Sequence, residues 1–125
     1  QVGQTLFGQS NDLFGFTIDL SSDGLTLVLG TPQGCILDHS YFGTGKIRVF
    51  RFSTYTGLWH PVGPDIHGEN SSDLFGSFVS LSENGAFVAV GGLNCDDPGG
   101  TYSGHVKVYQ INSVANETYF GDFLV

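Results

Sequence analysis

The chain of 125 residues contains an internal repeat. The tetrapeptide Asp-Leu-Phe-Gly occurs at Asp12–Gly15 and again at Asp73–Gly76, 61 residues later. A second matched stretch places Gly45–Phe50 over Gly104–Tyr109 at an offset of 59. A repeat of this length means that one supersecondary unit is used twice and stacked on itself. Whatever fold the first copy adopts, the second copy is therefore expected to adopt as well.

Each copy has the sequence signals of a four-stranded antiparallel meander. Asp23-Gly24 and Asn84-Gly85 are dipeptides that favour tight hairpin turns. The apolar run after each turn is almost unbroken, which indicates a strand covered on both faces. The third strand of each copy begins with alternating polar and apolar residues, which predicts a position nearer the solvent. The expected strands are 16–20, 25–29, 46–52 and 58–62 in the first copy, and 78–81, 86–90 and 105–111 in the second.

A sheet that is apolar on both faces cannot cover itself, so it needs like-built neighbours. Sheets stacked around an axis form a β-propeller, which contains about four to eight blades. We therefore expect an all-β fold with tandem four-stranded antiparallel blades of a β-propeller, two blades forming an incomplete ring. Residues 1–8 would be the end of a preceding blade's outer strand, 9–67 the first blade, and 68–125 the second blade with a divergent C-terminal strand. A two-sheet sandwich is the alternative.

Charge and glycosylation signals restrict the partners and the compartment. There are 12 acidic and 4 basic residues, and the formal net charge is −8. Such a surface repels phosphate backbones, so nucleic acid is not an expected partner. No apolar run reaches the roughly 20 residues of a membrane-spanning helix, so no membrane insertion is expected. Two acceptor sequons, at Asn70 and Asn116, favour an extracellular or cell-surface glycoprotein.

The repeat resembles a known family of extracellular propellers. Phe14-Gly15 is followed by Gly30-Thr31-Pro32, and Phe75-Gly76 is followed by Gly91-Gly92-Leu93. These motifs resemble the FG-GAP repeats of integrin-α-type β-propellers, and the stretch from Trp59 to Gly76 is similar to FG-GAP-like repeats of large extracellular proteins. The resemblance implies a non-enzymatic module for adhesion, ligand docking or architecture. Its partners would be other blades of the same polypeptide or other protein subunits.

One departure from the family concerns calcium. The family's repeats often carry an Asp-x-Asp-x-Asp-Gly loop that binds the ion, and this chain lacks that loop. The remaining candidate calcium ligands are Asn94, Asp96 and Asp97. Pro98 and the spacing of these residues do not match the family's loop, and Ca²⁺ takes 6–8 oxygen ligands. We therefore expect no cofactor and no metal.

The sequence contains few candidates for catalysis. No nucleophile–base motif occurs, so no catalytic residues and no enzyme activity are predicted, and a hydrolase propeller ranks last. Asp12 and Asp73 repeat at equivalent turns, which favours hydrogen bonding to backbone N–H groups over catalysis. Phe14, Phe75 and Trp59 are expected to pack between blades.

Two long loops supply the remaining candidates. Cys35 and Cys95 lie in equivalent loops, so they are a candidate disulfide between blades in an oxidising compartment. Free thiols or bonds to other chains are the alternatives. The same loops carry Tyr41, Phe42 and Tyr102 as candidate ligand contacts, since binding residues concentrate on loops held by rigid sheets. This leaves open a carbohydrate-binding, lectin-like propeller closed by oligomerisation, with glycans as partners.

Overall fold

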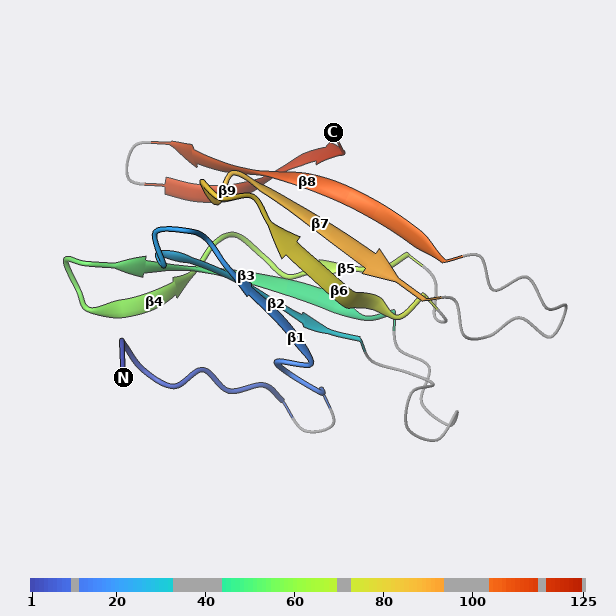
Figure 1. Cartoon of the computed structure of the whole chain (residues 1–125), viewed down its shortest axis with the longest axis horizontal. Helices are drawn as coiled ribbons and strands as arrows, with labels where there is room; N and C mark the ends of the chain where they lie inside the picture. Colours follow the sequence, from blue (N-terminus) through green and yellow to red (C-terminus); the bar gives the residue numbers. More distant parts are fainter. Residues whose placement is uncertain (10–11, 33–43, 70–72, 94–103, 115–116, 125) are drawn as a thin grey trace, which may run out of the picture.

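The chain forms two antiparallel β-sheets, one from each repeat (Figure 1). A computed structural model describes residues 1–9, 12–32, 44–69, 73–93, 104–114 and 117–124. Sheet A contains β1 (Thr17–Leu20), β2 (Thr26–Thr31), β3 (Lys46–Ser53) and β4 (Leu58–Pro61) in that order, with β5 (Ile66–His67) also paired to β3. Sheet B contains β6 (Phe75–Leu81), β7 (Phe87–Gly92), β8 (His105–Val114) and β9 (Glu117–Leu124) in that order.

The prediction of an all-β, antiparallel fold is confirmed, and the described residues contain no helix. The strand expected at 58–62 is β4, and the divergent C-terminal segment forms β9. Residues 1–9 are not a strand. Gln4 lies beside β4, where its side-chain amide donates to the Trp59 carbonyl at 2.8 Å and accepts from the Trp59 N–H at 2.8 Å.

The first hairpin of each repeat is closed by the same side-chain arrangement. In repeat 1 the Asp23 carboxylate accepts the Ser21 hydroxyl at 2.6 Å and the Leu25 N–H at 2.9 Å. In repeat 2 the Asn84 side-chain oxygen accepts the Ser82 hydroxyl at 2.8 Å and the Ala86 N–H at 3.0 Å. The hydroxyl of Ser21, and secondarily the Leu25 N–H, lower the pKa of Asp23. Asp and Asn serve alike because the turn needs one acceptor oxygen at this position.

The hydrophobic core lies between the two sheets. β6 crosses sheet A and contacts β2, β1 and β3 (Figure 1). Each aliphatic side chain removed from water here contributes about 1.5–3 kcal/mol relative to its exposed state. The core cluster contains Val28, Ile47, Val49 and Val62 from repeat 1, and Phe75, Val88, Val90 and Ile111 from repeat 2.

The faces that meet in this core are not equivalent by the repeat. Sheet A uses the face that carries Thr17 and Asp19, whereas sheet B uses the face that carries Val79 and Leu81. The repeat equivalents of Val79 and Leu81 are Ile18 and Leu20, which point away from the core and are exposed. We call the Thr17 side of a sheet its back face and the Ile18 side its front face. The back face of sheet A therefore packs on the front face of sheet B.

Two expectations about burial need correction. β2 is covered on both faces as expected, but β7 is covered on one face, since Val88 and Val90 are buried while Phe87 is 36% exposed. The third strand of repeat 1, expected near solvent, is instead central, and its Ile47 is fully buried. The reason is that sheet A is the sheet whose back face receives β6, and the strand's own pattern contains no information about that contact.

Candidate functional site

The two repeats join where the Phe-Gly motif of repeat 2 enters sheet A. The carbonyl group of Gly76 lies directly over the Cα of Gly30 and accepts the Thr17 hydroxyl at 2.9 Å. A Cβ built on Gly30 would lie 2.5 Å from the Thr17 Oγ1 atom and 2.9 Å from the Gly76 carbonyl carbon, closer than real Cβ atoms approach. Only glycine lets two backbones approach this closely. Gly30 and Gly76, one from each repeat, are thus the residues at which the two backbones meet.

Backbone hydrogen bonds extend this contact along the interface. The Phe75 N–H donates to the Thr44 carbonyl at 3.1 Å, and Gly45 forms a parallel bridge with Phe75. Farther along β6, the Leu81 N–H donates to the Asp19 carboxylate at 2.6 Å. Each such bond satisfies a polar group that would otherwise be buried without a partner.

The ring of Phe75 anchors the motif in the core. It is fully buried, lies parallel to the His105 ring at a centroid distance of 6.1 Å, and meets the Tyr109 ring edge-on at 6.2 Å. Burial raises the pKa of Tyr109, and the Glu69 carboxylate adds to the rise while Lys107 opposes it. The expectation that Phe75 packs between the repeats is met, whereas Trp59 packs on Phe52 within sheet A, with ring centroids 5.3 Å apart.

The turn before each Phe-Gly motif has the same unusual backbone. Leu13 and Leu74 have φ values of 53° and 48°, in the left-handed region that non-glycine residues seldom occupy. Gly15 and Gly76 follow with φ values of 81° and 93°. Repeat 1 therefore holds its motif in nearly the conformation that repeat 2 uses at the interface.

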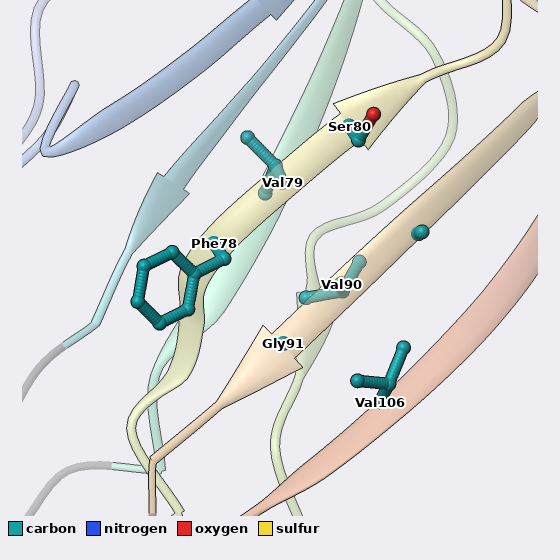
Figure 2. Close-up of a pocket in the computed structure, with 7 residues that line it drawn as sticks. Phe78, Val79, Ser80, Val90, Gly91 and Val106 are labelled. Atoms are coloured by element: carbon teal, nitrogen blue, oxygen red, sulfur yellow. The ribbon is translucent and has the colours of Figure 1, made fainter.

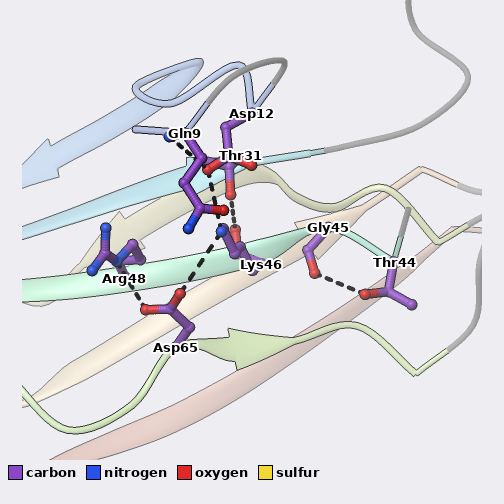
Figure 3. A network of polar contacts seen from close by, with 8 residues as sticks. All are labelled: Gln9, Asp12, Thr31, Thr44, Gly45, Lys46, Arg48 and Asp65. Carbon is purple, nitrogen blue, oxygen red and sulfur yellow. Dashed lines mark hydrogen bonds and ion pairs between the residues drawn. The ribbon is translucent and has the colours of Figure 1, made fainter. Parts of the chain in front are cut away.

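A polar network, buried at Asp12 and Lys46 and half-buried at Asp65 and Arg48, ties the first motif to sheet A (Figure 3). The Lys46 ammonium lies 3.2 Å from the Asp12 carboxylate and 3.8 Å from Asp65, and Arg48 donates to Asp65 at 2.8 Å. Asp12 is 3% exposed and also accepts the Gln9 N–H at 3.2 Å. Asp12 thus bonds a backbone N–H, as expected of a structural residue. The buried Asp12–Lys46 pair is thereby joined to the half-buried Asp65–Arg48 pair.

The back face of sheet B carries an open apolar hollow of about 300 Å³ (Figure 2). Phe78, Gly91 and Val106 come from three adjacent strands and surround it, as Figure 2 shows. Phe78 is 60% exposed and Val106 is 72% exposed. Because an exposed apolar patch usually marks a contact surface, this hollow is the candidate functional site. The remaining lining residues are Val79, Ser80, Ala89 and Val90.

The site residues expected from the sequence lie outside the described residues. This applies to the calcium, disulfide, glycosylation and ligand-loop candidates, so those predictions stay predictions. Among the described residues, no group of three or more His, Cys, Asp or Glu side chains could hold a metal ion. The residues concerned are Cys35, Tyr41, Phe42, Asn70, Asn94, Cys95, Asp96, Asp97, Tyr102 and Asn116.

Sequence reasoning missed the open face of sheet B. The signal was present in the repeat alignment: positions that hold Thr17 and Thr26 in repeat 1 hold Phe78 and Phe87 in repeat 2. A polar-to-aromatic change on an outer face suggests a covered surface. In the part of the chain that the structure describes, no helix is long and apolar enough to cross a membrane.

Comparisons of the chain with protein-family models, with curated proteins and with solved structures found no match.

Proposed function

We propose that this chain is a non-enzymatic segment of an extracellular β-propeller. It acts as a structural, adhesive or protein-docking module of a larger secreted or cell-surface assembly. Like-built sheets stack on both sides of the pair seen here, and the stacking itself is the function of the repeat.

The observation that carries this proposal is the meeting of non-equivalent faces. If two equivalent faces met, as in a symmetric sandwich, the contact would be complete with two sheets. When the back face of one sheet packs on the front face of the next, the first sheet keeps a front face and the second keeps a back face for further contacts. Further sheets can therefore add in the same way. Among the described residues, the open surfaces are the β1 edge of the front face of sheet A, where Ile18 and Leu20 are at least half exposed, and the back face of sheet B.

The Phe-Gly contact supports the resemblance to FG-GAP repeats. The motif glycine of one repeat, Gly76, is seated on Gly30 of the preceding repeat, and both glycines are part of the resembling motifs. This contact gives a physical reason for their spacing. Gly76 belongs to β6, which packs on sheet A, and Gly30 belongs to the back face of sheet A that β6 contacts. The strand order within each sheet is likewise the simple meander of a propeller blade.

Concatemers of the full chain would test the proposal. One, two and four copies are joined by Gly/Ser linkers of several lengths, since these behave as flexible coils. Stacking predicts that binding of a hydrophobic dye per copy falls and the thermal midpoint rises as copies are added. The control concatemer carries Val106→Asp in every copy, which blocks the receiving face. If every copy unfolds and binds dye as an independent unit at all linker lengths, the proposal is wrong.

A further inference from the structure

The covered face of sheet A shows what the open face of sheet B is built to receive. Ile47 on the covered face is fully buried, whereas its repeat equivalent Val106 is 72% exposed. Gly30 lies under the Gly76 carbonyl, whereas its equivalent Gly91 lies in the open hollow (Figure 2). β2 and β3 pair in the same register as β7 and β8, but a front face lies only on sheet A, and Phe78 and Phe87 take the places of Thr17 and Thr26.

Nothing among the described residues covers the β1 edge of the front face of sheet A. Phe16, Ile18 and Leu20 are 52%, 65% and 50% exposed. Their equivalents in repeat 2 are Ser77, Val79 and Leu81, which lie against sheet A. The Phe14–Gly15 turn resembles the docked Phe75–Gly76 turn, with φ values of 81° at Gly15 and 93° at Gly76. Among the described residues, no atom lies within 4 Å of a Cβ built on Gly15.

We propose that a second copy of this chain docks on the back face of sheet B through its own β1 front face and its Phe14–Gly15 turn. The association is head-to-tail, and it repeats between chains the contact that the two repeats make within one chain. This inference rests on the proposed function and names the partner. The donor and acceptor surfaces are present on every copy, so no other molecule is needed.

The chemistry of the two faces matches this occupant. No charged side chain lies among the residues of the hollow, so the net charge of −8 does not act within the contact. Phe78 stands where Thr17 stands on the covered face, so the back face of sheet B presents an aromatic ring in place of the hydroxyl that donates to the Gly76 carbonyl. The Phe78 side chain lies beside Gly91, 3.4 Å from where a Cβ would be, so the incoming turn would contact this ring.

The test uses two variants that each destroy one face. Ile18→Asp places a carboxylate on the incoming face and leaves the hollow intact. Val106→Asp does the reverse. Both positions are more than half exposed in the single chain, so each variant is expected to fold, and circular dichroism checks this. Tyr55→Asp is the matched control, because Tyr55 is 98% exposed on the β3–β4 turn, away from both faces.

Sedimentation velocity over micromolar to near-millimolar concentrations gives the readout. The wild-type chain and Tyr55→Asp should associate alike, and more tightly at high salt, which screens the repulsion between acidic copies. Each face variant should associate about 100-fold more weakly, because docking would bury an unpaired carboxylate. An equimolar mixture of the two should form a one-to-one dimer, since one supplies an intact hollow and the other an intact β1 face.

Three results would overturn the inference. They are a wild-type chain that stays monomeric throughout, a face variant that associates as well as wild type, or a mixture that fails to form the dimer while wild type associates. Concatemers that stack while free copies do not would keep the proposed function and assign the open faces to a different like-built repeat. Gly91→Ala adds an independent check, since a Cβ there would obstruct the incoming carbonyl and should weaken association about tenfold.

Discussion

Gly30→Ala is the sharpest test of the stacked sheets. The added methyl group would lie 2.5 Å from the Thr17 Oγ1 atom and 2.9 Å from the Gly76 carbonyl carbon. The Gly76 carbonyl cannot turn away freely, because it is held by the Thr17 hydroxyl. Relief therefore requires the two sheets to separate locally.

The magnitude follows from two opposing effects. Overpacking in a close-packed interior costs about 1–3 kcal/mol, and a clash with backbone belongs at the upper end. Replacing a glycine inside a strand by alanine returns about 0.5–1 kcal/mol of backbone entropy. The variant should therefore lose about 2 kcal/mol of unfolding free energy, which for a chain of this size lowers the thermal midpoint by about 8 °C.

The assay is equilibrium unfolding in urea and by heat, at protein concentrations low enough to keep the chain monomeric. Gly91→Ala is the matched control, because Gly91 occupies the equivalent position of repeat 2 on a face that no sheet covers. Its new Cβ would lie 3.4 Å from the Phe78 side chain, an ordinary contact. This variant should be as stable as wild type or up to about 1 kcal/mol more stable.

The comparison between the two alanine variants decides the matter. Equal effects at Gly30 and Gly91 would mean that sheet B does not lie on sheet A as described. An unchanged midpoint for Gly30→Ala would mean the same, because a methyl group cannot enter the described contact without moving it.

Three further predictions concern the charges, the buried phenol and the sequons. Lys46→Met should cost about 3 kcal/mol in urea unfolding by leaving Asp12 buried without its cation, and Asp12→Leu/Lys46→Met should lose less than the single variant. Because burial raises the pKa of Tyr109 above its ordinary 10.0, the unfolded chain loses the phenol proton first, and the free energy of unfolding falls as the pH rises above about 10. Tyr109→Phe should reduce this fall, and an unchanged slope above about pH 10 would contradict it. Secretion from eukaryotic cells should add N-glycan mass at Asn70 and Asn116, which Asn→Gln variants at both sites remove; a secreted chain without glycan mass would count against the extracellular assignment.

Much of the local structure could be read from the chain because its causes are local. Asp23-Gly24 and Asn84-Gly85 identified both first hairpins, since those dipeptides accept the turn backbone, with Gly24 and Gly85 at φ values of 75° and 71°. The apolar runs placed the second strands to within one or two residues. The left-handed φ at Leu13 and Leu74 could not be foreseen, because neither residue favours it.

The candidate site was harder to foresee because it depends on which sheet faces lack a neighbour. Val106 and Ile47 are similar aliphatic residues at equivalent positions, and nothing in their local patterns separates an exposed side chain from a fully buried one. The polar network was also hidden, since Asp12 and Lys46 are 34 residues apart and meet only after β3 is laid beside the N-terminal turn.

The sequence by itself determines the strands, the turns and the repetition of the unit. These features depend on side-chain alternation and turn preference within stretches of a few residues. Which face of one unit packs on which face of the next is set by contacts between segments about 60 residues apart, such as Gly30 with Gly76. That choice belongs to the tertiary structure, because copies with equivalent patterns end up with one back face covered and the other open.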